Sequence, residues 1–174
     1  MRVKDGTFDP ANEGSVVRGN WLSHGTLECY SLKESRRFYE EFLGLECVRH
    51  AKPAMALRCG MKCHIVCVEV GAAVHPTSVL NHWGIDVGSN EEVDRVWHAA
   101  HALKEKYKIR QVLDKVKQHG VYSFYLEDLD HNWWEIQYYD GVQHEDMFDF
   151  GDRFDMDEDS DIHNLRELEI ETSK

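Results

Sequence analysis

Residues 81–92 read Asn-His-Trp-Gly-Ile-Asp-Val-Gly-Ser-Asn-Glu-Glu, the pattern of a short strand that leads into a capped helix. Ser89 and Glu92 form a Ser-x-x-Glu capping box, in which the serine hydroxyl accepts from a helix N–H and the glutamate reaches back. His82 lies on the strand, seven residues before Ser89. The pattern therefore predicts a strand at 81–87 and a helix from 91 to about 106.

The same unit occurs once more, 58 residues earlier in the chain. His24 lies seven residues before Ser31, and Ser31 with Glu34 makes a second Ser-x-x-Glu box. Two copies of one strand-helix unit, each opening with a histidine, predict a pseudo-symmetric domain in which His24 and His82 face each other.

Each half is expected to continue with three further strands. The first half has a predicted strand at 21–30, a helix at 32–43 that ends at Gly44, and strands at 45–50, 54–58 and 62–70. In the second half, strands are expected at 109–117, 121–127 and 132–139, with a turn at 128–131. The chain therefore belongs to the α+β class.

Length and composition favour a single globular domain. The chain has 174 residues, 42% of them hydrophobic, and contains no apolar run long enough for a membrane span and no signal-peptide core. We therefore expect a cytoplasmic protein that does not insert into a membrane. We also expect an amino-terminal arm at 1–19, one domain at 20–142 with modules at about 20–71 and 80–140, and a tail at 143–174.

The negative charge is concentrated in that tail. The net charge is −12, and residues 143–174 contain twelve Asp or Glu against three Lys or Arg, a net of −9 that leaves −3 for residues 1–142. An acidic segment repels phosphate, which excludes nucleic acid as an expected partner. We predict no chemistry for the tail.

The cysteines are expected to be free thiols. No Cys-x-x-Cys pair occurs among the five, which are Cys29, Cys47, Cys59, Cys63 and Cys67. Cys63 and Cys67 are four residues apart on a predicted strand, which separates them by roughly 13 Å, too far to share one zinc ion.

The last strand carries an acidic residue in aromatic surroundings. By the two-residue period of a strand, Glu135 shares one face of 132–139 with Trp133, Gln137 and Tyr139. A carboxylate in that position is costly unless another group pairs with it. We therefore expect Glu135 to have a partner group in the folded protein.

With its two strand-helix-strand-strand-strand halves, a histidine on the first strand of each and a glutamate on the last, the chain resembles the vicinal oxygen chelate superfamily. This superfamily contains glyoxalase I, fosfomycin resistance proteins, bleomycin-binding proteins and type I extradiol dioxygenases. The resemblance covers about residues 20–139 and implies two βαβββ modules that form one open, cup-shaped mixed sheet with the helices outside. It also implies a divalent metal held by His24, His82 and Glu135, a ligand set that suits non-haem Fe(II).

Two further segments are similar to the extradiol dioxygenase branch. Residues 55–66, Met-Ala-Leu-Arg-Cys-Gly-Met-Lys-Cys-His-Ile-Val, resemble the segment in which a strand ends in Arg-Cys and the next begins with a proton-managing histidine, here His64. Residues 118–125, Gln-His-Gly-Val-Tyr-Ser-Phe-Tyr, followed ten residues later by Glu135, resemble the signature of a histidine and a Phe-Tyr pair ahead of the metal-binding glutamate. The resemblance therefore implies catalytic roles for His64, Tyr125 and His119, although His119 lies closer to Phe-Tyr than the family histidine does.

The implied activity is extradiol cleavage of a catechol-type aromatic diol with O2. Fe(II) is the expected cofactor, with Mn(II), Zn(II) and Ni(II) as alternatives, and the expected assembly is a homo-oligomer, a dimer or higher. Two other activities stay open. If His64 is a fourth ligand, three histidines and a glutamate fit a glyoxalase-like lyase or isomerase, and a bleomycin-resistance-type binding protein would use the fold without catalysis.

Overall fold

The computed structural model describes residues 23–60, 63–118 and 120–139, and these fall into two compact units. The first unit contains the described residues up to His82, together with 103–110 and 127–133. The second contains residues 83–102, 111–126 and the described part of the chain from Trp134. The predicted arm at 1–19, the tail at 143–174 and His119 lie outside the described residues.

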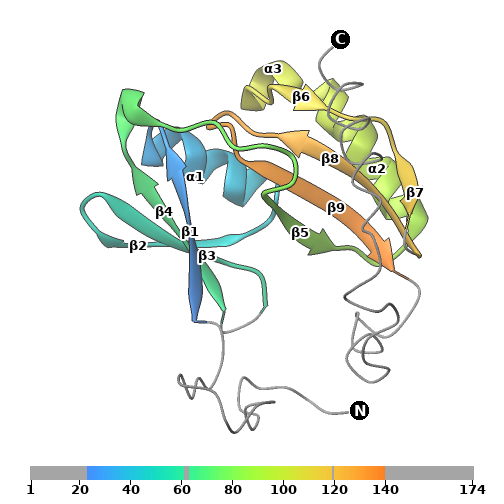
Figure 1. The fold of residues 1–174 in the computed structure, drawn as a ribbon, viewed down its shortest axis with the longest axis horizontal. Helices are drawn as coiled ribbons and strands as arrows, with labels where there is room; N and C mark the ends of the chain where they lie inside the picture. The colour runs from blue at the N-terminus through green and yellow to red at the C-terminus, as the bar shows by residue number, and fades with distance from the viewer. Residues whose placement is uncertain (1–22, 61–62, 119, 140–174) are drawn as a thin grey trace, which may run out of the picture. The chain divides into compact units, whose positions relative to one another are not determined.

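The sheet of the first unit has four strands in the order β1-β4-β3-β2 (Figure 1). Its elements are β1 (His24–Cys29), α1 (Leu32–Glu41), β2 (Glu46–Ala51), β3 (Ala54–Arg58) and β4 (His64–Glu69), followed by the short 3-10 helix η1 (Gly71–Ala73). β1 and β4 are parallel, whereas β3 is antiparallel to both β2 and β4. This is the predicted βαβββ order.

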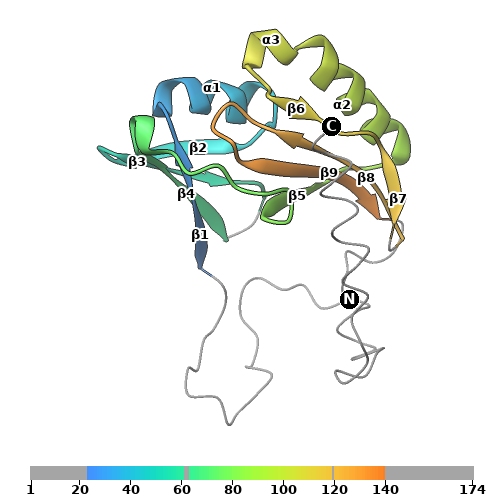
Figure 2. The same cartoon turned by 45° about the horizontal axis from the view of Figure 1, so that its top comes forward.

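Helix α1 covers one face of this sheet (Figure 2). Its buried side chains include Phe38 and Tyr39, and burial raises the pKa of the Tyr39 phenol well above its ordinary value. Because strand side chains alternate between faces, His24 and His64 lie on the face away from α1. Gly44 follows the helix with φ +69°, which is the predicted left-handed position.

The second sheet has the order β5-β9-β8-β6, with β7 also paired to β8. Its elements are β5 (His82–Asp86), α2 (Asn90–Ala102), β6 (Gln111–Val112), β7 (Val116–Gln118), β8 (Val121–Glu127) and β9 (Trp133–Tyr139). The α+β class and the two βαβββ modules are therefore confirmed, and the strands are arranged as two sheets, one for each module.

The helix predicted at 91–106 is in fact two helices, α2 and α3 (Lys104–Tyr107). Leu103 between them has φ −105° and ψ 10°, which is not helical. Tyr107 on α3 packs against Phe38 of α1 and donates a hydrogen bond to Glu41, so α3 belongs to the first unit while α2 belongs to the second. The strand predicted at 109–117 is likewise interrupted between β6 and β7.

Of the two predicted capping boxes, one forms in part and the other does not form. Ser89 Oγ accepts from the Glu92 N–H at 3.2 Å, but the Glu92 carboxylate binds Arg95 instead of reaching back. The box predicted at Ser31 is wrong, because the Ser31 side chain makes no capping hydrogen bond. The carboxylate of Glu69, on β4, accepts from the first helical N–H at Leu32 instead, at 2.7 Å.

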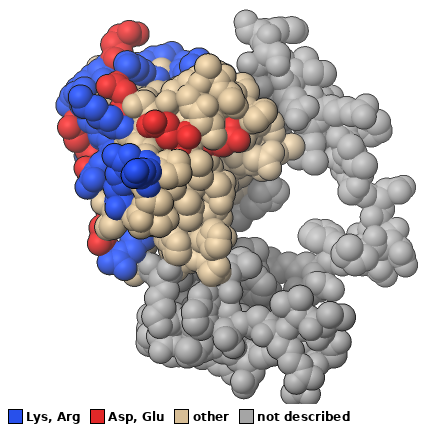
Figure 3. Space-filling model, turned by 90° about the vertical axis from the view of Figure 1, so that its left-hand side faces the viewer, with Lys and Arg blue, Asp and Glu red and all other residues tan. Residues whose placement is uncertain are grey.

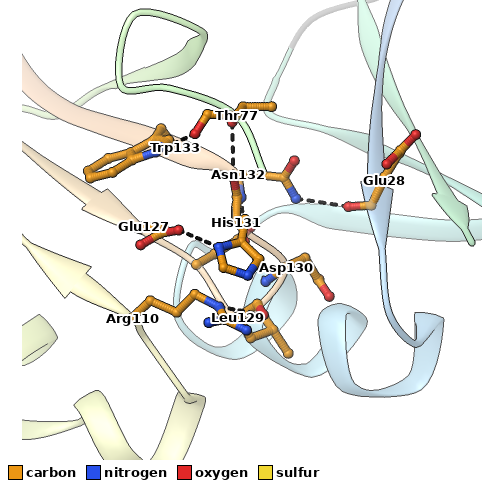
Figure 4. A network of polar contacts seen from close by, with 10 residues as sticks. Glu28, Thr77, Arg110, Glu127, Leu129, Asp130, His131, Asn132 and Trp133 are labelled. Carbon is orange, nitrogen blue, oxygen red and sulfur yellow. Dashed lines mark hydrogen bonds and ion pairs between the residues drawn. The ribbon is translucent and has the colours of Figure 1, made fainter. Parts of the chain in front are cut away.

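The predicted turn at 128–131, between β8 and β9, belongs to the first unit and is held there by a polar network (Figure 4). Asn132 Nδ2 donates to the Glu28 carbonyl at 2.9 Å, and the Trp133 indole donates to the Thr77 carbonyl at 3.1 Å. His131 Nδ1 lies 2.6 Å from Oε1 of the Glu127 carboxylate. The carboxyl end of β8 and the amino end of β9 therefore belong to the first unit, although most of both strands lies in the second unit.

Several charged side chains on the surface of the described part are paired. On α1, Arg36 binds Glu40 and Arg37 binds Glu41, and across β2 and β3 Arg58 binds Glu46. From the side of Figure 1 on which β2 lies, basic and acidic side chains intermingle over one area, beside a largely uncharged surface (Figure 3). Among the described helices, none is long and apolar enough to cross a membrane.

Candidate metal centre

Two of the predicted site histidines lie side by side in the first sheet. His24 opens β1 and His64 opens β4, and the two residues are direct partners in the parallel register. Their rings are stacked, with centroids 5.7 Å apart and planes 19° from parallel. Ser23 Oγ lies 2.8 Å from His24 Nδ1, which leaves Nε2 as the nitrogen able to bind a metal. The structure therefore brings together a predicted ligand and a predicted catalytic residue.

His82 at the start of β5 is held in one tautomer. Its Nδ1 lies 2.7 Å from the Val79 carbonyl oxygen, and because a carbonyl only accepts, Nδ1 must carry the proton. In the neutral ring Nε2 then has the lone pair that metal coordination requires. A ligating histidine typically donates its other N–H in this way to fix the orientation of the ring.

Glu135 is the predicted ligand on β9, and it is buried, with 8% of its surface exposed. Tyr125, on the adjacent strand β8, donates a hydrogen bond to its carboxylate. Burial and this hydrogen bond raise the pKa of Tyr125 to about 12. The phenol therefore stays protonated and remains a donor at physiological pH. The expectation that a buried carboxylate on this strand needs a partner is met by Tyr125.

Gln118 extends this chain of hydrogen bonds and was not predicted. Its Nε2 donates to the Tyr125 hydroxyl at 3.2 Å, so the order is Gln118 to Tyr125 to Glu135. Gln118 ends β7 and pairs with Val121 across a tight turn in which Gly120 has φ +80°. A glutamine two residues before a turn glycine was the available signal, but only the pairing of β7 with β8 shows that it lies beside Tyr125.

The complete ligand set stays a prediction. Within 23–60, 63–118 and 120–139, no three His, Cys, Asp or Glu side chains are gathered as a metal site requires. His24, His64 and His82 belong to the first unit, whereas Glu135 belongs to the second. The donor types nevertheless fit a first-row divalent metal, because two imidazoles with a defined metal-binding nitrogen and one buried carboxylate are ligands that such ions prefer.

The chain resembles proteins of known structure over most of its length. The fosfomycin resistance protein FosX from Listeria monocytogenes is 22% identical, with a TM-score of 0.57 over 72% of this chain and 97% of that protein. FosX has also been solved with Mn(II) and sulfate, and that structure is 20% identical with a TM-score of 0.57 over 78% and 99% of the two chains. Lactoylglutathione lyase from Agrobacterium tumefaciens is 20% identical, with a TM-score of 0.53 over 69% and 94%. At these identities the likeness shows a shared fold.

No protein among curated sequences matches the chain. The family profile described as the Glyoxalase/Bleomycin resistance protein/Dioxygenase superfamily, however, matches residues 21–136, which is more than half of the chain and contains both modules with His24, His82 and Glu135. The chain belongs to the glyoxalase/bleomycin resistance protein/dioxygenase superfamily, also called the vicinal oxygen chelate superfamily.

Proposed function

We propose that this protein is a divalent-metal enzyme in which His24, His82 and Glu135 bind the metal and His64 acts beside it. The observation that carries the proposal is the in-register pair of His24 and His64, whose rings stack on one face of the first sheet. This adjacency puts a titratable imidazole next to a predicted ligand, where a general acid or base is useful. The structure of the similarly folded FosX in complex with Mn(II) further supports a divalent ion.

The reaction we propose is extradiol cleavage of a catechol with O2, with Fe(II) as the metal. When bound, the metal would lower the pKa of a chelated diol and bind both co-substrates. His64 would accept a catechol proton and return it during ring opening. Tyr125 would hold the Glu135 carboxylate, and both atoms of O2 would enter the ring-opened product, so no external reductant is consumed. His119, outside the described residues, is proposed only by resemblance.

A glyoxalase-like lyase or isomerase is the second candidate, and the same histidine pair favours it. Two imidazoles that bind one ion at metal–nitrogen distances of about 2.1 Å have ring centroids roughly 4.5–5.5 Å apart. The centroids of His24 and His64 are 5.7 Å apart, just beyond that range, so one of the two stacked rings would have to turn for both to bind one ion. His64 as a fourth ligand would leave fewer open positions on the metal, which suits isomerisation or lysis better than binding of both a diol and O2.

Oxygen uptake tests the choice between the two activities. Protein purified anaerobically and reconstituted with Fe(II) is mixed with 2,3-dihydroxybiphenyl and with simpler catechols. The dioxygenase proposal expects oxygen consumption and a yellow ring-opened product, and it expects His64→Ala to retain iron while losing turnover. Absence of oxygen uptake across the panel, with tight Ni(II) or Zn(II) binding that His64→Ala weakens, would instead establish the four-ligand candidate.

A further inference from the structure

The face of the first sheet that lies away from α1 carries a row of ionisable side chains. Glu46 on β2 is the register partner of Arg58 on β3, and His24 on β1 is the partner of His64 on β4. Because Leu57 pairs with Ile65, Arg58 and His64 occupy adjoining positions on neighbouring strands. The four groups therefore follow one another across the sheet as Glu46, Arg58, His64 and His24.

The next row across the same face is small and uncharged. Val48 pairs with Ala56, and Ala56 pairs with Val66. Val48 is 54% exposed, which is unusual for a valine on a strand. The two rows together offer a polar edge beside an apolar floor.

A cavity lies where these rows meet. It has a volume of about 260 Å³ and is lined by Glu46, Val48, Ala56, Leu57, Arg58 and His64. An apolar cavity of roughly 150 Å³ accommodates benzene, so this volume suits one substituted ring or a molecule of similar size. All six lining residues belong to the first unit, and His64 joins the cavity to the proposed metal ligand His24.

Arg58 is oriented at the edge of the cavity. Its Nε and Nη2 donate to the two oxygens of Glu46, at 2.6 and 3.0 Å. This side-on pairing uses one edge of the guanidinium and fixes its plane, and no other partner of Arg58 is found within the described ranges. The Nη1 group, with two N–H donors, is then available to a ligand in the cavity.

We propose that this cavity binds an oxyanion group of a small substrate, with Arg58 as the anchor and Glu46 as the residue that positions it. The proposal rests on the proposed metal site, since the other end of the substrate would be chelated at the metal beside His24 and His64. A planar guanidinium with a free edge recognises a carboxylate or phosphonate through charge-assisted hydrogen bonds. Val48 and Ala56 would contact the apolar body of the substrate.

The test uses pairs of catechols in which a free carboxylate is replaced by its neutral methyl ester. Dissociation constants for 3,4-dihydroxybenzoate and its methyl ester, and for the 2,3-isomer and its ester, are measured by catechol absorption on Zn(II)-loaded protein, which does not turn over. We expect at least one of the two acids, the 3,4- or the 2,3-isomer, to bind about tenfold more tightly than its own ester. Arg58→Gln should bring this ratio close to one, and Arg58→Lys should retain part of it.

Two further variants make the test specific to the cavity. Glu46→Gln keeps a carbonyl oxygen that accepts from Arg58 but removes the neutralising charge, so it should increase the preference for the acid. Arg36→Gln removes the same charge from an exposed pair with Glu40 on α1 and should leave the ratio unchanged. Equal affinity for acids and esters in the wild type, or an unchanged ratio in Arg58→Gln, would overturn the inference.

The proposed metal site is tested separately in the same titration. His24→Ala should weaken acid and ester equally if both probes chelate the metal. Unchanged affinity in His24→Ala would refute the proposed metal site, whereas the acid-to-ester ratio would still report on Arg58. The two proposals therefore fail through different measurements.

Discussion

Replacement of Tyr125 tests whether its hydrogen bond orients the carboxylate of the proposed ligand Glu135. Its hydroxyl accepts from Gln118 and donates to Glu135, so Tyr125→Phe removes the bond that orients this carboxylate. We expect metal affinity to fall roughly 10- to 100-fold, as is typical when a group supporting a metal ligand is lost. Calorimetric titration with Mn(II) or Zn(II) measures the change.

Tyr122→Phe provides a matched control. Tyr122 lies on the same strand, and its hydroxyl also donates to a carboxylate, that of Asp94 at 2.7 Å. It points to the opposite face from Tyr125 because the two are three positions apart. Equal losses of metal affinity in the two variants would show that Tyr125 acts only on general stability.

The Tyr125 phenol should also be recognisable by its titration. Burial and the bond to Glu135 raise its pKa to about 12, whereas an ordinary tyrosine has a pKa of about 10. The difference in phenolate absorption between wild type and Tyr125→Phe should therefore appear near pH 12. Because the folded-state pKa is raised, the stabilisation linked to this proton is complete below about pH 10 and is lost as the pH rises toward 12. A difference spectrum centred near pH 10 would contradict the assigned environment.

At the scale of elements, the cysteines divide into three on strands β1, β2 and β4 and two in the connection between β3 and β4. Cys29, Cys47 and Cys67 are buried, and Cys59 and Cys63 are exposed. Burial raises the pKa of Cys47 to about 11, which disfavours the reactive thiolate at neutral pH. A thiol reagent such as DTNB at pH 8 should therefore modify two thiols rapidly and the other three only after denaturation. Rapid modification of Cys47 would contradict the β2 register.

The β8–β9 turn is the element that depends most on a single buried carboxylate. Asp128 accepts from the backbone N–H groups of Asp130 and Asn132 and from the Tyr39 hydroxyl. Asp128→Ala leaves these buried donors without an acceptor, and we expect the free energy of unfolding to fall by about 3 kcal/mol. Urea denaturation measures this. Asp114→Ala, at an exposed position, should change stability by less than about 0.5 kcal/mol.

Local sequence signals were sufficient for several elements and insufficient where a distant residue decides the outcome. The bounds predicted for β3 and β8 are those observed, because clear turn signals flank both strands. The cap of α1 was predicted wrongly at Ser31, because the acceptor for the first helical N–H, that of Leu32, is the carboxylate of Glu69, 37 residues away. The break between α2 and α3 at Leu103 was not predicted either, because the helical sequence pattern continues through it. The contacts that Tyr107 makes with α1 are not visible in the local sequence.

The same distinction applies to the site. The set His24, His64, His82, Tyr125 and Glu135 was predicted from repetition, resemblance and the unusual acid on an aromatic strand, and it stays a prediction. The structure brings together two pairs of it, His24 with His64 and Tyr125 with Glu135. Gln118 and Arg58 were missed because their positions beside Tyr125 and His64 result from strand pairing, which composition and period do not specify.

At the scale of the whole molecule, the proposed metal site requires ligands from both modules to bind one ion. Neither module supplies the set alone, because His24 lies on β1, His82 on β5 and Glu135 on β9. A metal bound in this way stabilises only the folded chain in which both modules are assembled. The loss of any one ligand should therefore impair the same single site.

The most direct test of this claim is an anaerobic equilibrium titration with Fe(II), Mn(II), Ni(II) and Zn(II). It is applied to the wild type, to His24→Ala, His82→Ala and Glu135→Gln, and to His75→Ala, an exposed histidine outside the proposed set, as control. We predict one tightly bound ion per chain in the wild type and His75→Ala, and affinity at least about 100-fold lower in each ligand variant. Wild-type affinity in any ligand variant, or no tight binding of any of the four ions by the wild type, would contradict the account.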